Sequence, residues 1–276
     1  MPHARIATVL SGLCLFLSAP HAATAQLWLP VDAQRTTLRL DVAKPLFDVG
    51  AFRDAHFATV VWDATLVVPM DGIPTLYAQL GLSIGEITGT GWTATVSKPR
   101  IGTILGRDRG LHGELHADLP LAREMGGEFA TVVGQYTHVE EWERFGPESW
   151  AVGGSVTAES EVSPATFLGT RVGGTLVVPT ADNVGRDAFA VFTFFGEAPT
   201  GRARVLFEFS GVALLTQPEL NFSERTTFFA AASVSLPTDR LAPEAYVRVP
   251  LDENVSTIVS FILGVRVHLG GPRPRG

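Results

Sequence analysis

Apolar and polar residues alternate with a period of two along most of this chain, which indicates β-strands with one face in apolar surroundings. Between 111 and 119, the odd positions hold Leu, Gly or Ala and the even positions hold His, Glu or Asp. From 259 to 269, every odd position is Val, Phe or Leu. The pattern predicts about twelve antiparallel strands, at residues 35–44, 56–69, 73–83, 93–106, 109–120, 149–160, 164–178, 186–196, 201–214, 225–236, 242–251 and 255–269.

The predicted strands are long. Most of them have about 10–15 residues, whereas strands of globular proteins usually have about 5–6. A tilted strand needs about 9–11 residues to cross the hydrocarbon core of a membrane. Long strands with one apolar face therefore favour an all-β, antiparallel, up-and-down transmembrane β-barrel of about twelve strands.

The connections between the predicted strands also follow a pattern. Long and short connections alternate through the first six, and 215–224 is longer than both of its neighbours. Outer-membrane barrels have short periplasmic turns and longer external loops, so the long connections are expected outside. The last connection, 252–254, breaks the alternation. The connections are 45–55, 70–72, 84–92, 107–108, 121–148, 161–163, 179–185, 197–200, 215–224, 237–241 and 252–254.

One segment, 127–145, departs from the period of two. Its apolar residues, among them Phe129, Val133 and Tyr136, recur at helical spacing. This predicts a short amphipathic helix in the longest external loop. The helix is either a lid or plug over the barrel mouth or a helix that only covers the rim.

The first 25 residues have the layout of a secretory signal peptide. A positive start with Arg5 precedes an apolar run from Ile6 to Leu17, and a small-residue end follows before Gln26. Because Cys14 lies in the run, a lipoprotein signal is the competing interpretation. We expect a cleaved signal peptide over 1–25, an outer-membrane barrel over 26–269 and a disordered tail over 270–276.

Composition and charge narrow the class of protein. The chain has 21 Lys and Arg against 28 Asp and Glu. Only Arg5 of these lies in residues 1–25, so the remainder has 20 − 28 = −8 charges, which disfavours nucleic acid as a partner. Mean hydropathy is +0.22, yet no segment after the first 25 residues is apolar enough for a membrane helix. A barrel whose alternate residues face lipid explains both observations.

Several segments resemble a known group of proteins. They are Lys98–Gly102, Gly110–Leu115, Asp118–Leu121, Gly173–Thr180 and the closing strand. In their glycine-rich hairpins and in strands that end in Leu-Pro or Val-Pro, they resemble outer-membrane transporter barrels of the meta-pathway phenol-degradation type and related uncharacterised barrel families. The resemblance implies an outer-membrane barrel that carries a solute. It supplies no motif from which binding residues can be transferred.

The polar faces of the strands supply the candidates for lining the lumen. A wall with both signs of charge either forms ion-pair networks that fill the lumen or lines a hydrated path for a solute. The candidates are Asp63, His112, Glu114, His116, Asp118, Glu159, Arg171, Arg202, Arg204, Glu208, Glu244, Arg248, Arg266 and His268.

Catalysis and cofactor binding have weaker support. His112, Glu114, His116 and Asp118 share one strand face, but a metal would need further ligands from neighbouring strands, so we expect neither a metal nor another cofactor. Barrel phospholipases and lipid A deacylases use a Ser and a His on the wall. No such motif is present, and the chain is not expected to be an enzyme.

The leading hypothesis is a passive channel or transporter for a small solute in the outer membrane of a Gram-negative bacterium. Its expected partners are outer-membrane lipid, the solute and the barrel-assembly machinery. One alternative is a structural or adhesive barrel with a filled lumen. Another is a soluble exported lipocalin-like barrel, because alternation alone does not say which face points inward.

Overall fold

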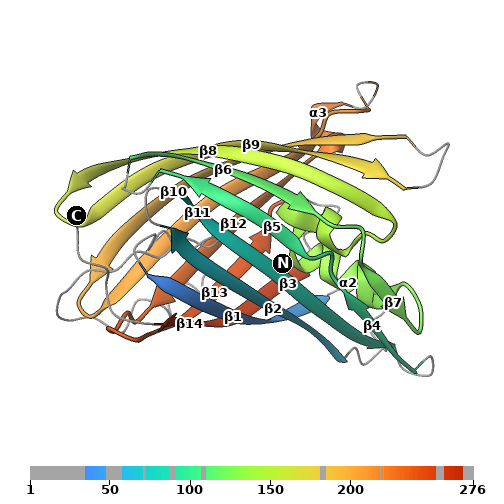
Figure 1. The fold of residues 1–276 in the computed structure, drawn as a ribbon, viewed down its shortest axis with the longest axis horizontal. Coiled ribbons are helices and arrows are strands. Elements are labelled where there is room, and N and C mark those ends of the chain that lie inside the picture. The colour runs from blue at the N-terminus through green and yellow to red at the C-terminus, as the bar shows by residue number, and fades with distance from the viewer. Residues whose placement is uncertain are drawn as a thin grey trace, which may run out of the picture.

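The structure is a computed structural model of the chain, and it is a closed antiparallel β-barrel (Figure 1). The residues it describes are 35–47, 58–70, 73–87, 91–106, 110–180, 185–217, 219, 221–252 and 258–269. The predicted signal peptide, 1–25, and the predicted tail, 270–276, lie outside the described residues.

Twelve strands form the wall, as predicted, and each pairs with its neighbours in antiparallel register. β1 pairs with β14 from Thr36↔Leu269 to Phe47↔Ile258, which closes the ring. The strands are β1 (Thr36–Phe47), β2 (Ala58–Met70), β3 (Ile73–Ile87), β4 (Gly91–Val96) with β5 (Arg100–Leu105), β6 (Leu111–Asp118) with β7 (Arg123–Met125), β8 (Ser149–Ser163), β9 (Thr166–Pro179), β10 (Asp187–Thr200), β11 (Ala203–Leu214), β12 (Thr226–Ser235), β13 (Leu241–Pro250) and β14 (Ile258–Leu269).

Two wall strands are each interrupted, which the sequence pattern does not predict. β4 and β5 both pair with β3, so they are two halves of the strand predicted over 93–106. Between them, Lys98 donates its backbone N–H to the carbonyl oxygen of Arg144 at 2.7 Å. The next residue, Pro99, has no N–H for the ladder. β6 likewise stops at Asp118, shortly before Pro120, and its continuation β7 pairs with β4.

The apolar face of the wall points outward and the polar face points inward. On β11, Phe207 is 55% exposed and Phe209 is 39% exposed, whereas Arg204 is 2% exposed and Glu208 is 6% exposed. The same inversion recurs on the other strands, whose exposed side chains include Leu, Ile, Val, Phe and Trp. So large an apolar surface needs an apolar surrounding, because exposing it to water is costly. The fold is therefore that of a transmembrane barrel, in which alternate residues face lipid, and not that of a lipocalin.

The connections divide between the two ends of the barrel as the alternation predicts, with two differences. One end holds 48–57, 88–90, 126–148, 180–186, 215–225 and 251–257, and the other holds 71–72, 106–110, 164–165, 201–202 and 236–240. Connection 88–90 is shorter than predicted because β3 continues to Ile87, and it has fewer residues than 106–110 at the other end, so the predicted alternation fails there. Connection 251–257 is longer than predicted because β14 begins at Ile258, so the last connection follows the alternation. We call the first of these ends the long-loop end.

Among the described residues, helices occur in two connections, both at the long-loop end. The connection 126–148 contains α2 (Phe129–Thr137) and the 3₁₀ helix η2 (Val139–Phe145), where the helical spacing predicts a helix. The short helix α3 (Phe222–Arg225) is not predicted, although the N-cap residue Asn221 and Glu224 in its first turn form a capping box. In the part of the chain that the structure describes, no helix is long and apolar enough to cross a membrane.

Candidate functional site in the barrel lumen

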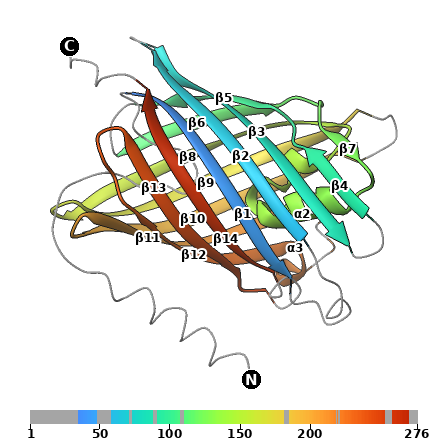
Figure 2. The ribbon, with the colours of Figure 1, turned by 90° about the horizontal axis from the view of Figure 1, so that it is seen from below.

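The segment formed by α2 and η2, which we call the plug, lies inside the ring of strands near the long-loop end (Figure 2). Val133 and Phe145 of the plug are both 0% exposed. They share one apolar cluster with inward-facing side chains of six strands, namely Ala43, Val61, Leu206, Ala231, Tyr246 and Ile262. Burying a side chain of the size of Val133 or Phe145 contributes about 1.5–3 kcal/mol. Of the two interpretations of this helix, the structure therefore supports the plug and not the rim.

Two glycines of β3 make room for the plug. A Cβ atom built on Gly85 would lie 2.7 Å from the ring of Phe129, and one on Gly81 would lie 3.0 Å from the ring of Phe145. Both glycines are buried on the inner face of β3. Because glycine has no side chain, the plug packs closer to the β3 backbone at these two positions than it could if a larger residue replaced either glycine.

Buried arginines hold the acidic end of the plug to the wall. Arg144 of the plug donates two hydrogen bonds to Asp63 of β2, at 2.9 and 3.0 Å. In the opposite direction, Arg100 of β5 donates to Glu143 at 2.8 Å and also to Glu141. Bidentate pairs of this kind are geometrically specific, and removing one partner leaves an uncompensated buried charge.

A second anchor lies across the lumen on β13. Arg248 forms an ion pair with Glu140 at 2.8 Å and donates to the backbone carbonyl of Thr137 at 3.1 Å. Ser210 of β11 donates its hydroxyl to the same Glu140 at 3.1 Å. The plug is thus tied to β2, β5, β11 and β13, so its position is fixed from several sides of the lumen.

Burial changes the pKa of two groups in the plug. It lowers the pKa of His138 to about 4, against the opposing effect of Asp63, whose carboxylate is 3.6 Å away. It raises the pKa of Glu143 to about 7, because desolvation of the carboxylate outweighs the attraction of Arg100. His138 is therefore neutral near pH 7, and Glu143 titrates near that pH.

Further from the long-loop end, the inner wall carries ion pairs that do not involve the plug. Glu114 of β6 accepts hydrogen bonds from Tyr77 at 2.5 Å and from Arg171 at 2.8 Å. Arg204 pairs with Glu197 across the β10–β11 hairpin. These pairs neutralise and fix charges that would be unfavourable alone in the lumen.

Almost all sequence-predicted lining candidates lie on the inner wall. The exception is Arg202, which lies in the turn between β10 and β11 and is exposed. The sequence pattern continues the alternation to Arg202, one residue before the strand begins at Ala203. The candidates found on the inner wall are Asp63, His112, Glu114, His116, Asp118, Glu159, Arg171, Arg204, Glu208, Glu244, Arg248, Arg266 and His268.

The sequence pattern does not identify several other residues of the lumen. Arg39 and Asp41 alternate with apolar residues on β1 and pair at 2.6 Å, so the same period-two signal could have identified them. Arg100 lies directly after Pro99 at the start of β5, where the sequence pattern gives no sign of a lumen residue. Glu140 and Arg144 lie at the polar end of the predicted helical segment, and the sequence does not identify them as lumen residues because their partners lie on strands distant in the sequence.

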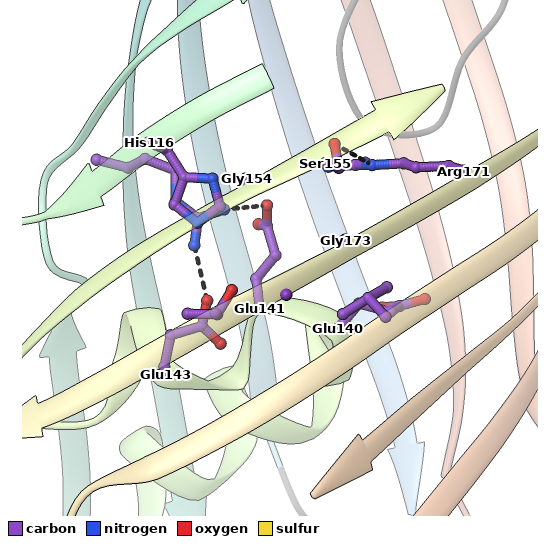
Figure 3. Close-up of a pocket in the computed structure, with 12 residues that line it drawn as sticks. His116, Glu140, Glu141, Glu143, Gly154, Ser155, Arg171 and Gly173 are labelled. Atoms are coloured by element: carbon purple, nitrogen blue, oxygen red, sulfur yellow. Dashed lines mark hydrogen bonds and ion pairs between the residues drawn. The ribbon is translucent and has the colours of Figure 1, made fainter. Parts of the chain in front are cut away.

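A cavity separates the plug from the wall formed by β8 and β9 (Figure 3). Its volume is about 20 Å³, which is close to what one ordered water needs. Its lining combines side chains of η2, β5 and β6 with small residues of β8 and β9. The lining residues are Arg100, His116, Glu140, Glu141, Glu143, Gly154, Ser155, Arg171, Gly173, Gly174, Thr175 and Val191.

Among the described residues, no group of three or more His, Cys, Asp and Glu side chains is placed to hold a metal ion. On β6, His116 lies 3.5 Å from Glu114, whereas His112 approaches Glu159 of β8 at 3.7 Å. Asp118 pairs with Arg100 of β5, so the four polar residues considered as ligands do not converge on one point. The arrangement is one of charge pairing along the wall.

Solved structures with this fold are outer-membrane barrels. The COG4313 outer membrane channel from Pseudomonas putida F1 has a TM-score of 0.59 at 12% identity and covers 90% of this chain and 100% of its own. LpxR from Salmonella typhimurium has a TM-score of 0.53 at 9% identity and covers 84% and 100%. The NanC porin has a TM-score of 0.50 at 8% identity and covers 84% and 100%.

No family model matches the chain, and no curated protein matches its sequence. The similarity to the three structures, all far below 25% identity, shows the fold of an outer-membrane barrel. The resemblance inferred from the sequence is supported at that general level, and membership of the phenol-degradation family is not established.

Proposed function

We propose that this protein is a passive channel for a small solute in the outer membrane. In this proposal a cleaved signal peptide directs its export, and the barrel-assembly machinery inserts it into the outer membrane. The observation that carries the proposal is an inverted barrel whose inner wall is charged and whose plug leaves a polar cavity beside the wall. Among the proteins of similar fold, one is described as an outer membrane channel and one as a porin.

The charges around the plug point to a preference for cations. Four arginines, Arg100, Arg144, Arg171 and Arg248, form ion pairs with six carboxylates. These carboxylates are Asp63, Glu114, Asp118, Glu140, Glu141 and Glu143. The ammonium of the buried Lys98 also lies near Asp118 and Glu143, so the excess is 6 − 5 = 1 carboxylate, reduced where Glu143 holds its proton. A lumen lined with excess negative charge raises the local concentration of cations.

Conductance of the purified full-length protein in planar bilayers tests this proposal. We expect discrete openings, and in a KCl gradient a reversal potential that shows K⁺ to be more permeant than Cl⁻. Absence of conductance, together with no solute uptake by liposomes that contain the folded barrel, would refute the channel. Cold SDS-resistance of the outer-membrane fraction, lost on boiling, verifies that the tested protein is a folded barrel.

The filled-lumen barrel remains the second candidate, and the ion pairs between the plug and the wall favour it. In that case Arg144 and Arg248 serve only to fix the plug, and the wild-type protein does not conduct. An enzymatic role has less support. The hydroxyl of Ser210 on the inner wall would be a candidate nucleophile, but it donates its hydrogen bond to Glu140 of the plug and not to a histidine. The conductance experiment separates the two candidates directly.

A further inference from the structure

We propose that the solute passes between the plug and the wall formed by β8, β9 and β10, and that Trp142 closes the end of this passage nearest the long loops. The inference rests on the proposed channel function and adds the route, the gating residue and the class of solute. It predicts which side of the plug is accessible when the channel opens.

The opposite side of the plug is filled. There, Thr131 of α2 shares a hydrogen bond of 2.8 Å with Thr95 of β4, and the backbone N–H of Ala130 donates to Thr93 at 3.1 Å. The rings of Phe129 and Phe145 lie against Gly85 and Gly81 of β3. Ser83, between these two glycines, is 0% exposed. A solute therefore finds no space between α2 and the wall of β3 and β4.

The wall of β8 and β9 carries small residues where it faces the plug. Gly153 lies opposite Thr175, and Ser155 lies opposite Gly173, in the β8–β9 register. Their small size leaves the cavity between this wall and the acidic turn of η2. The plug thus packs directly against β3 and β4 on one side, and among the described residues a cavity lies along β8 and β9 on the other.

The lining of the cavity suits a small polar solute that donates hydrogen bonds. The side chain of His116 is 7% exposed, and its Nε2 atom has no hydrogen-bond partner among the described residues. Glu140, Glu141 and Glu143 line the facing side, as Figure 3 shows. Arg100 and Arg171 also line the cavity, so with all three carboxylates ionised its lining carries 2 − 3 = −1 charge. This small negative excess and the buried imidazole nitrogen together favour hydrogen-bond donors and small cations over anions.

Trp142 packs on wall residues that lie nearer the long-loop end than the residues lining the cavity. Its ring makes an edge-to-face contact with Phe189 of β10, with 5.1 Å between the ring centroids. It packs on the cluster of Ala151, Val177, Phe189 and Val212. In the β8–β9 register, the pair Ala151↔Val177 is closer to the long-loop end than Gly153↔Thr175. Rotation of one indole ring would therefore open the passage without breaking the ion pairs of Arg144 and Arg248.

Cysteine accessibility tests the route. The only cysteine of the chain is Cys14, in the expected signal peptide, so the protein without an added cysteine gives the background. We compare Ser155→Cys, beside the cavity, with Ser83→Cys, its matched control under the plug. A membrane-impermeant, positively charged methanethiosulfonate reagent is added to intact cells. We expect Ser155→Cys to react about tenfold faster than Ser83→Cys.

The gate is tested in the same background. Trp142→Ala should speed the modification of Ser155→Cys about tenfold, because it removes a packed aromatic pair, and should leave Ser83→Cys unchanged. Trp142→Phe, which keeps a ring at this position, should stay close to the wild type. Equal rates at the two cysteines, or no effect of Trp142→Ala, would overturn the inference.

Conductance of the same variants distinguishes this inference from the proposed function. If modification of Ser155→Cys lowers the single-channel current and modification of Ser83→Cys does not, the route carries the conducted ions. If the labelling rates follow the expectation but no variant conducts, the passage exists and the channel function is refuted. Current that continues unchanged after full modification of Ser155→Cys overturns the route while the channel stands.

Discussion

Arg144 of the plug grips Asp63 of β2 through two parallel hydrogen bonds of 2.9 and 3.0 Å, and the arginine side chain is 0% exposed. Arg144→Met would leave the carboxylate of Asp63 buried beside the plug with its main partner removed. We expect the barrel to lose about 3–5 kcal/mol of stability, and the plug to become mobile, because an uncompensated buried charge is costly.

The measurements for Arg144→Met are the temperature at which cold SDS-resistance is lost and the mean single-channel current. The first should fall and the second should rise. Arg123→Met, at an exposed position of β7, is the matched control and should change neither. Unchanged stability of Arg144→Met would mean that this ion pair does not hold the plug.

The close approach of the plug to β3 gives a second prediction. Gly85→Ala places a Cβ atom 2.7 Å from the ring of Phe129, so that ring and α2 must shift. We expect a destabilisation of about 1–3 kcal/mol, as for other overpacked interiors. Gly113→Ala on β6 is the control, because its nearest neighbouring atom is 3.7 Å away. Hydrogen exchange of the α2 amides should increase in Gly85→Ala alone, and equal exchange in both variants would contradict this account.

The sequence predicts the wall well because each wall residue meets one of two very different surroundings. Phe207 faces outward and Glu208 faces inward, so apolar side chains occur where the wall faces lipid and polar side chains occur where it faces the lumen. What alternation leaves open is which face points inward. The exposure of Phe207 and the burial of Glu208 in the closed ring decide that question.

The plug is different, because its position depends on residues far apart in the chain. Helical spacing predicts a helix around Phe129, but nothing in that segment says that its ring fits against Gly85. The same holds for Arg100 and Glu143, which meet only after β5 is placed in the ring. Local periodicity therefore identifies the helix and leaves its location inside or outside the lumen undecided.

Two neighbouring arginines, which the sequence pattern treats alike, should behave differently. Arg204 is 2% exposed and forms an ion pair with Glu197, whereas Arg202 is exposed in the turn. We expect Arg204→Met to cost about 3 kcal/mol or more, because it breaks the buried ion pair with Glu197. Arg202→Met should stay within about 0.5 kcal/mol of the wild type. Urea unfolding in lipid vesicles measures both, and similar losses in the two variants would contradict the assignment of Arg202 to the turn.

The raised pKa of Glu143 predicts how stability depends on pH. Glu143 is buried and faces Arg100 of β5 and Lys98 beside it, which favour its ionisation, and Asp118 of β6 and Glu141, which oppose it. Burial dominates and places its pKa near 7 instead of the ordinary 4.5. Between these two values the folded protein holds a proton that the unfolded chain has released. The contribution of Glu143 to the free energy of unfolding therefore falls as pH rises through this window.

Glu143→Gln isolates this contribution. His138 acts in the opposite sense, because its pKa is lowered from 6.5 to about 4 and its contribution rises with pH between those values. Since both proteins contain His138, the difference between wild type and Glu143→Gln removes its effect. We expect the variant to gain stability relative to the wild type as pH rises from about 5 to about 8. The check is the temperature at which cold SDS-resistance is lost at each pH. A difference between the two proteins that is constant across this range would show that Glu143 is ionised throughout, and that Arg100 outweighs the cost of burial.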